Sequence, residues 1–311
     1  MSIASEIRKG LSPLEVEFGA AAAGEDEARL FLPLTRLGGA RAECLFGAAR
    51  PVGEQDGFRL FAADELLVGW SIEPAGADLA ASGCELYRRL LAAAAGRPLC
   101  RVWNYVPQIN ALRGGLENYR AFNAGRAAAF RAALGGAYPG ALPSASAVGC
   151  QGDALAAIFV AAPERPRHFE NPEQLPAYRY PSEHGPCPPS FARATAAIWA
   201  GRPLIFISGT AAIKGHASVA PGSFEDQTAC TLDNLRLISR TAGLGDDLGA
   251  GDGFTRHFKI YLRRGADLPA AQARLSRALL RPADGVIWLE TDLCRAELDI
   301  EIEATLIGPQ R

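Results

Sequence analysis

An order of strands and helices that occurs twice along the chain constrains the fold more than any other feature of this sequence. In the first copy, expected strands at residues 60–70 and 100–106 alternate with expected helices at 82–95 and 117–134. The first of these helices is indicated by apolar residues that recur at helical spacing. The repeated order indicates an internal duplication in which each copy forms one structural unit.

The second copy continues the same order more clearly. A strand expected at 203–208 precedes a helix that begins near Ser223, where Ser223 and Asp226 have the spacing of a capping box. The elements expected after it are a strand at 255–263, a helix at 268–280 and strands at 286–291 and 297–306. The whole pattern predicts an α+β fold of two modules, each a sheet covered by a helical layer.

The same pattern predicts where the chain divides. We expect an N-terminal domain at residues 1–145 and a C-terminal domain at 146–311. Between the two copies, the proline-rich stretch 138–189 is partly linker, and its apolar run at 155–161 is expected to form another strand. Residues 1–60 carry no motif that indicates a structure or a function.

Charge and apolar composition narrow the class of function. With 49% hydrophobic residues and a net charge of −2, the chain can bury a large core and offers no excess positive charge to nucleic acid or to an anionic membrane. No apolar segment has membrane-spanning length, the first ten residues included, so we expect a cytoplasmic protein whose partner is a small molecule. The seven cysteines are scattered without a CxxC pair, which argues against a disulfide framework or a structural zinc site.

The C-terminal half resembles the RidA (YjgF) family. Four segments carry the resemblance in the right order: a Gly-Pro turn with the strand after it, a strand that ends in Ser-Gly, the first helix, and a closing strand. These segments are residues 185–194, 204–209, 227–235 and 300–304. The resemblance implies the fold of that family for the second, catalytic module, and the repeated order of elements extends it to the first as a degenerate RidA-like module.

A wider resemblance, from about residue 98 onward, is to the chorismatases, which are built on the RidA fold. In the N-terminal half it rests on Arg-Val-Trp-Asn-Tyr at 101–105, Ile-Asn at 109–110, and the Tyr-Arg-Ala-Phe and Gly-Arg-Ala segments at 119–122 and 125–127. In the C-terminal half it rests on segments at 178–181, 209–216 and 292–295. The resemblance implies a cleft between the two halves, in which chorismate is cleaved and pyruvate is released without a metal or an organic cofactor.

Glu301 is the residue that we expect to act as the general acid. Its position resembles that of the RidA-family strand glutamate that faces the ligand pocket. Breaking the enol ether of chorismate requires a proton on its methylene carbon, and an acid that keeps its proton near neutral pH must be buried so that its pKa is raised. The pattern alone leaves another interpretation open, because Asp299, Glu301 and Glu303 form the polar face of an amphipathic strand and such faces are usually exposed to water.

The other expected site residues would hold the substrate. Chorismate carries two carboxylates, which guanidinium groups bind in bidentate fashion, and Arg126 and Arg193 are the expected cations because each lies within a resembling segment, with Arg179 as a third choice. The remaining expected contacts come from hydroxyl groups, a backbone turn and an amide, on Tyr105, Tyr180, Gly209, Thr210 and Asn104. Each of these residues also has an ordinary interpretation, as a surface arginine, a half-buried tyrosine or part of a strand-ending turn.

Cys294, seven residues before Glu301, is expected across the pocket from the acid. A cysteine here resembles the chorismatases that make a hydroxybenzoate, which favours 3-hydroxybenzoate as the second product; an inert buried thiol is the other interpretation. Also open are 4-hydroxybenzoate, hydrolysis to 3,4-dihydroxycyclohexa-1,5-diene carboxylate, a RidA-like enamine or imine deaminase, and a non-catalytic carboxylate-binding module. Only the second copy has the Glu-Ile-Glu-Ala strand, so we expect one active site per chain, in a monomer or a homo-oligomer.

Overall fold

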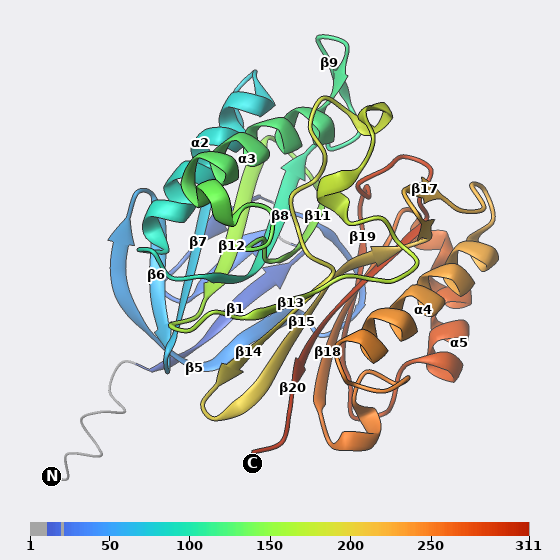
Figure 1. Ribbon diagram of the computed structural model, residues 1–311. Helices are drawn as coiled ribbons and strands as arrows, with labels where there is room; N and C mark the ends of the chain where they lie inside the picture. Colours follow the sequence, from blue (N-terminus) through green and yellow to red (C-terminus); the bar gives the residue numbers. More distant parts are fainter. Residues whose placement is uncertain (1–10, 20–21, 311) are drawn as a thin grey trace, which may run out of the picture.

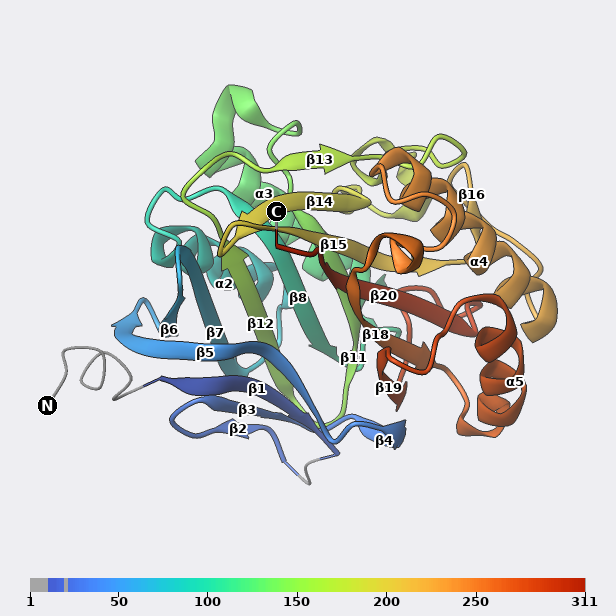
Figure 2. The ribbon, with the colours of Figure 1, turned by 90° about the horizontal axis from the view of Figure 1, so that it is seen from below.

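Two β-sheets face each other at the centre of the molecule, and each carries two helices on its outer side (Figures 1 and 2). This computed structural model describes residues 11–19 and 22–310. One apolar core fills the space between the sheets, and two further cores lie between each sheet and its helices. The prediction of an α+β fold with two sheet-and-helix modules is confirmed.

The first sheet has nine strands and is covered by helices α2 (Leu79–Ala93) and α3 (Asn118–Leu134). In spatial order its strands are β11 (Ser144–Cys150), β8 (Leu99–Pro107), β12 (Ala154–Ala161), β7 (Leu66–Pro74), β6 (Phe58–Ala63), β5 (Ala42–Gln55), β1 (Ser12–Phe18), β3 (Arg29–Leu32) and β2 (Gly24–Glu25). The side chain of Asp78 caps the start of α2 by accepting a hydrogen bond from the N–H of Ala80. The two helices pack so closely at Gly125 that a Cβ atom there would lie 2.0 Å from the carbonyl oxygen of Ala80, which explains the glycine of the Gly-Arg-Ala segment.

The second sheet has seven strands and is covered by helices α4 (Phe224–Thr241) and α5 (Leu268–Ala278). In spatial order its strands are β13 (Arg167–Phe169), β14 (Ala194–Trp199), β15 (Arg202–Ala211), β20 (Ile300–Ile307), β18 (Thr255–Leu262), β19 (Gly285–Glu290) and β4 (Thr35–Gly39). The expected cap of α4 is confirmed, because the hydroxyl of Ser223 accepts a hydrogen bond from the N–H of Asp226 at 3.3 Å. Two small hairpins complete the fold, β9 (Leu112–Arg113) with β10 (Leu116–Glu117) and β16 (Ile213–Lys214) with β17 (Ala217–Ser218).

The structure corrects one expected strand. Residues 60–70 do not form one strand, because they contain the end of β6 and the start of β7, which pair as an antiparallel hairpin. The chain turns at Asp64, which has a positive φ of 52°. Apolar residues occupy both sides of this turn, so hydrophobic periodicity could not show it.

The described residues before position 60, which carry no motif, form most of one edge of the first sheet. They include β1, β2, β3 and β5, and they also supply β4, which pairs with β19 of the second sheet. The expected boundary between residues 145 and 146 falls inside β11, and both β11 and β12 belong to the first sheet. The division into domains stays a prediction, and the order of the strands favours a boundary after Ala161.

Two further observations bear on the expectations from composition. All seven cysteines are free. Within the described residues, no helix is both long enough and apolar enough to cross a membrane. The first ten residues, which contributed to the expected cellular location, lie outside the described part of the chain.

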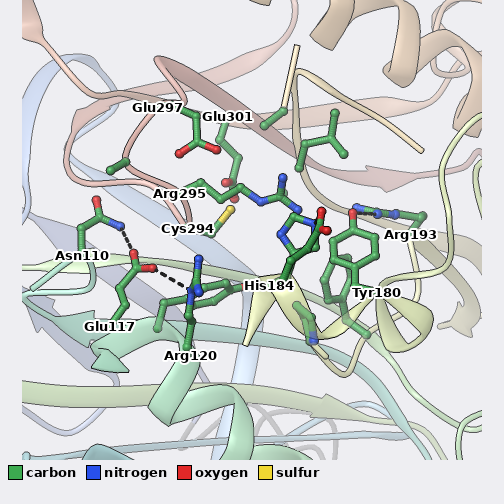
Figure 3. Close-up of a pocket in the computed structure, with 18 of the residues that line it drawn as sticks. Asn110, Glu117, Arg120, Tyr180, His184, Arg193, Cys294, Arg295, Glu297 and Glu301 are labelled. Atoms are coloured by element: carbon green, nitrogen blue, oxygen red, sulfur yellow. Dashed lines mark hydrogen bonds and ion pairs between the residues drawn. The ribbon is translucent and has the colours of Figure 1, made fainter. Parts of the chain in front are cut away.

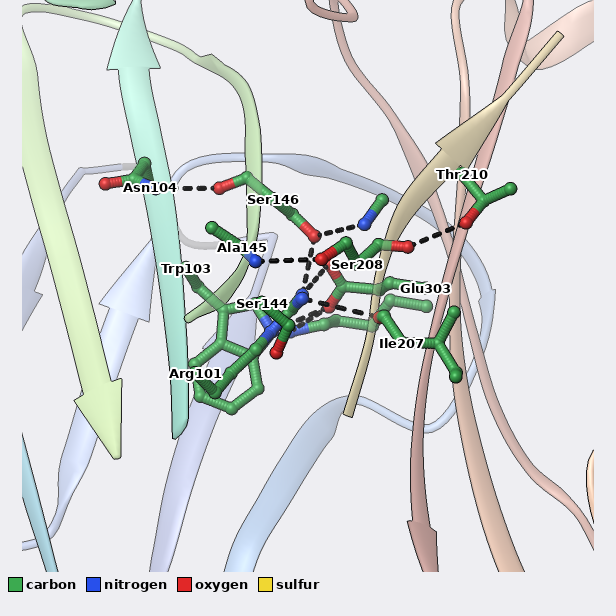
Figure 4. A network of polar contacts seen from close by, with 12 residues as sticks. Arg101, Trp103, Asn104, Ser144, Ala145, Ser146, Ile207, Ser208, Thr210 and Glu303 are labelled. Atoms are coloured by element: carbon green, nitrogen blue, oxygen red, sulfur yellow. Dashed lines mark hydrogen bonds and ion pairs between the residues drawn. The ribbon is translucent and has the colours of Figure 1, made fainter. Parts of the chain in front are cut away.

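Charged side chains lie inside the contact between the two sheets (Figure 4). Arg101 of β8 donates to the Glu303 carboxylate of β20 at 2.7 Å, and the indole N–H of Trp103 donates to the same group at 2.8 Å. Lys259 of β18 lies 2.8 Å from Glu303 and 2.5 Å from Glu43 of β5. We call Arg101, Glu303, Lys259 and Glu43 the buried charge network. Burial raises the pKa of Glu303, but Lys259 and Arg101 outweigh that effect and hold the pKa below its usual value, so Glu303 is ionised.

Candidate active site

A cavity of about 490 Å³ opens between the two modules (Figure 3). Its walls come from the start of α3, the segment between β13 and β14, the end of β15, the start of β20 and the loop between β19 and β20. The acidic, basic, amide and thiol side chains on these walls are Asn110, Glu117, Arg120, Glu183, His184, Arg193, Cys294, Arg295, Glu297 and Glu301. Both halves of the chain therefore contribute to one cavity.

Glu301 lies on the cavity wall, and only 3% of it is exposed. Burial raises the pKa of its carboxyl group to about 8, with a further contribution from the ionised Glu303 two residues along the strand. Arg101 and Arg193 act in the opposite direction but do not offset the burial. At neutral pH this carboxyl group holds its proton, as a general acid must.

A bulge in β15 makes room for this carboxyl group. Ile207 pairs with Ala304 and Thr210 with Ile302, so the two residues between Ile207 and Thr210 stand opposite Glu303 alone. One of the two is Gly209, where a Cβ atom would lie 1.9 Å from Oε1 of Glu301. The acid therefore rests directly against the backbone of the bulge, in a space that only glycine leaves free.

The first prediction follows from this contact. Gly209→Ala is expected to lower kcat about 100-fold, because the added methyl group displaces the carboxyl group, and a misplacement of about 1 Å can have an effect of that size. Steady-state kinetics with circular dichroism as a check on folding would measure it. The matched control is Gly47→Ala in β5, where a Cβ atom meets nothing within 4 Å. Equal activity of the two variants would contradict the inferred contact.

The two expected cations approach Glu301 from different sides. Arg126 of α3 lines a small recess of about 20 Å³ together with Gly209, Cys294 and Glu301. Its Nη2 donates to Asn123 at 2.7 Å, while its Nε and Nη1 have no hydrogen-bond partner within the described structure. Buried guanidinium N–H groups without partners are costly, so this recess suits a bound carboxylate.

Arg193 lies on the wall of the main cavity, where Figure 3 shows it beside Tyr180. Its Nη2 donates to the hydroxyl of Tyr180 at 2.7 Å, and its Nε has no partner within the described residues. Tyr180 also lines the cavity. The structure thus brings Arg126, Arg193, Tyr180 and Gly209 together around Glu301, as the sequence predicts.

Cys294 lies beside the Glu301 carboxyl group, on the wall that the cavity and the recess share (Figure 3). Burial raises the pKa of its thiol, and the nearby Glu301 adds to the effect. The sulfur is therefore a neutral thiol at neutral pH and not a thiolate nucleophile. It can shape the site, accept weak hydrogen bonds and hold a substrate in place.

Four other expected substrate contacts lie away from both the cavity and its recess. The hydroxyl of Thr210 donates to the carbonyl of Ser208, and Asn104 donates to the carbonyl of Ser146. Tyr105 is fully buried in the core between the sheets, and Arg179 is an exposed residue that lies over the ring of Tyr178. These side chains contact other residues of the protein and do not line the cavity or its recess. The structure therefore does not support substrate contacts by Thr210, Asn104, Tyr105 or Arg179.

The sequence interpretation also missed residues that line the cavity. Arg295 lies near its centre, where it donates to Ser218 at 3.0 Å and lies over the ring of Tyr180 (Figure 3). Arg120 lies 3.3 Å from Glu117 on the opposite wall. Both arginines lie within segments that resemble the chorismatases, so the sequence contained a signal for them. A motif does not show, however, which of its side chains point into a cavity. His216, which had no evident partner in the sequence, lies 3.0 Å from His184.

Comparisons with known proteins agree with this geometry. The family model described as "Chorismatase FkbO/Hyg5-like, N-terminal" matches residues 45–161, and its last residue is also the last residue of β12. The chain is 36% identical to a 3-hydroxybenzoate synthase of Streptomyces hygroscopicus over 67% of its own length and 63% of that protein's, which is less than two thirds of the relative.

Two further matches extend over most of the chain. It is 35% identical to a chorismatase of Streptomyces rapamycinicus over 82% of its own length and 78% of that protein's. A chorismatase crystal structure at 1.08 Å resolution superposes with a TM-score of 0.81 and 30% identity, over 98% of this chain and 95% of that one. Because these matches include both modules and the cavity between them, the chain belongs to the chorismatase family.

Proposed function

We propose that this protein cleaves the enolpyruvyl ether of chorismate and releases pyruvate and a hydroxybenzoate, 3-hydroxybenzoate being favoured. The observation that carries the proposal is the buried carboxyl group of Glu301 in a cavity lined by arginines. Chorismate is a dianion, and both Arg126, in the recess beside the acid, and Arg193, on the cavity wall, have guanidinium nitrogens without a partner in the described structure. An acid that donates a proton, placed among cations that bind the substrate, is what the reaction requires.

The chemical steps follow from these positions. Glu301 donates its proton to the methylene carbon of the enol ether, which leaves an oxocarbenium-like carbon between the ether oxygen and the carboxylate. Water attacks that carbon and loses a proton, the bond between that carbon and the ether oxygen breaks, and pyruvate leaves the ring diol. When the ring also loses water and becomes aromatic, the products together have the same atoms as chorismate. If the neighbouring ring hydroxyl attacks instead, the bond between its oxygen and the ring breaks as well, that oxygen leaves as the carbonyl oxygen of pyruvate, and the ring loses a proton as it becomes aromatic. The carboxylate left on Glu301 is stabilised by Arg101 and Arg193 until it takes up a proton again.

One experiment tests the function directly. Purified protein is incubated with chorismate, pyruvate is measured with lactate dehydrogenase, and the second product is identified by chromatography and mass spectrometry. Equal amounts of pyruvate and 3-hydroxybenzoate are expected. Pyruvate with the dihydrodiol or with 4-hydroxybenzoate would change only the product assignment, whereas thermal stabilisation by chorismate without any pyruvate would indicate a binding module. Ammonia released from an enamine substrate, with chorismate untouched, would indicate a deaminase.

The product assignment gives the second prediction. Cys294→Ala is expected to change the ratio of hydroxybenzoate to dihydrodiol more than the rate of chorismate loss, because the thiol borders the acid without supplying its proton. Product ratios from chromatography would measure the change. Cys230→Ala serves as the control, since Cys230 is a partly buried cysteine of α4 that does not line the cavity. An unchanged product ratio in Cys294→Ala would remove the cysteine from product control.

The remaining expectations stay predictions. The small-molecule partner is chorismate under the proposed function, and nothing in the proposal requires nucleic acid, a membrane or a cofactor. A cytoplasmic location is the expectation from the sequence. The cavity is formed within one chain, which is compatible with either a monomer or a homo-oligomer.

A further inference from the structure

Two histidines and a glutamate converge at the edge of the cavity. Glu183 and His184 belong to a short helical turn at Ser182–His184 that lines the cavity, and His216 lies in the β16–β17 hairpin. Nε2 of His184 lies 3.0 Å from Nδ1 of His216. Oε1 of Glu183 lies 3.4 Å from the first of these nitrogens and 3.3 Å from the second. We call these three residues the rim triad.

The three distances match the spacing between neighbouring ligand atoms around a tetrahedrally coordinated metal ion. Metal–ligand bonds of about 2.0–2.1 Å at tetrahedral angles place neighbouring ligand atoms about 3.3–3.4 Å apart. One proton shared between the two imidazole nitrogens would make a hydrogen bond between the histidines. The two contacts from the Glu183 carboxylate to those nitrogens would then contain no hydrogen bond. A divalent ion above the triangle would satisfy all three atoms at once.

The surroundings hold the two imidazole rings in place. The ring of Tyr180 packs against both imidazoles, at centroid distances of 5.3 Å to His184 and 6.4 Å to His216, which fixes their positions. Arg295 and Arg120 oppose a cation here, while Glu183 supplies one compensating negative charge.

We propose that the rim triad is a binding site for a divalent transition metal ion such as Zn²⁺, held by His184, His216 and Glu183. It goes beyond the proposed function, because chorismate cleavage by Glu301 uses no metal. Two of the three ligands line the cavity, so the fourth coordination position is free on that side for water or for a carboxylate of a bound molecule. A bound ion would tie the 182–184 turn to the β16–β17 hairpin at the edge of the cavity.

Metal titration of the full chain, after treatment with a chelator, tests the proposal. Co²⁺ is added while its visible absorption is recorded, and Zn²⁺ is then used to displace it. One ion per chain is expected in the wild type. His216→Ala is expected to weaken binding at least about 100-fold, since loss of a group that only supports a ligand already costs 10–100-fold. Glu183→Gln is expected to weaken it as well, because an amide is a poorer ligand than a carboxylate.

Two controls keep the outcome specific. His257→Gln removes a histidine of β18 outside the triad and should bind like the wild type. His216 does not line the cavity, so ion-free His216→Ala should keep its turnover of chorismate, which also shows that it folds. Equal binding by wild type and His216→Ala would place the ion elsewhere, for example at a cysteine, and would overturn the proposal, as would no binding at all. The titration uses no chorismate, so its result is independent of the proposed reaction.

Discussion

Glu301→Gln is expected to lower kcat for pyruvate release about 1,000-fold and to leave KM within about threefold of the wild-type value. An amide has nearly the shape of a protonated carboxyl group but cannot donate a proton of comparable acidity, and general acid catalysis contributes about 10²–10⁴-fold. The arginines that bind the substrate are not changed by the substitution. Steady-state kinetics with the coupled pyruvate assay would measure both parameters.

Glu297→Gln is the matched control for this variant. Glu297 also lines the cavity, but it is exposed to solvent. Although burial acts to raise the pKa of its carboxyl group, hydrogen bonds from Ser218 and from the backbone, together with the charges of Arg295 and Arg263, outweigh that effect and lower the pKa below its usual value, so Glu297 is ionised at neutral pH. Its variant should keep kcat within about tenfold of the wild-type value, because an ionised group is not the proton donor. Near-normal turnover in Glu301→Gln would remove Glu301 from the mechanism.

Lys259→Met is expected to lower the free energy of unfolding by about 3–5 kcal/mol, the usual result of removing one partner of a buried ion pair. Lys259 is 3% exposed and lies between the carboxylates of Glu43 and Glu303. Methionine fills a similar volume, so the loss reports the Glu43 carboxylate left without a cation in the described structure and the Glu303 carboxylate left with Arg101 and Trp103 alone, and not a cavity. Urea denaturation followed by circular dichroism would give the value.

A surface lysine with the same arrangement provides the comparison. Lys214 also bridges two carboxylates, those of Glu173 and Asp233, but it is 32% exposed. Lys214→Met should therefore cost less than about 1 kcal/mol, as exposed ion pairs usually do. If the two variants lost similar small amounts, the buried charge network would not matter to stability.

The helices and the C-terminal strands could be predicted because each has a local signal. The apolar spacing of α2 and α3 and the cap of α4 at Ser223 lie within a few residues of one another in the sequence. The strands before residue 58 have no such signal, since what stabilises them is pairing with distant segments. β4, for example, pairs with β19 about 250 residues later in the chain.

The resembling segments located residues around the cavity on a strand, a helix and loops alike, but they did not show which of their side chains point into it. Alternation placed Asp299, Glu301 and Glu303 on one face of β20, but that face is buried only because the first sheet lies opposite, and the sequence cannot show that sheet's position. Successive residues of a strand also point to opposite faces. Asn104 therefore points toward Tyr87 of α2, while Tyr105 next to it points into the core between the sheets, and neither reaches the cavity.

The charge network explains why two glutamates on one strand differ. Glu303 has Arg101, Trp103 and Lys259 as direct partners and is ionised. Glu301 has no cation within salt-bridge distance in the described structure, and the ionised Glu303 adds to the effect of burial on its pKa. The buried charge network keeps Glu303 ionised, and this negative charge raises the pKa of Glu301 and so helps its carboxyl group to hold the proton.

The protonation state of Glu301 is the central claim, and infrared difference spectroscopy measures it directly. The spectrum of Glu301→Gln is subtracted from that of the wild type over a range of pH, which cancels other protonated carboxyl groups such as Glu170, whose pKa burial raises to about 7. The remaining signal should include the carbonyl stretch of a protonated carboxyl group at pH 7 and should disappear with a midpoint near pH 8. A signal that shows an ionised carboxylate at pH 7, with a midpoint near the ordinary glutamate value of about 4.3, would contradict the account.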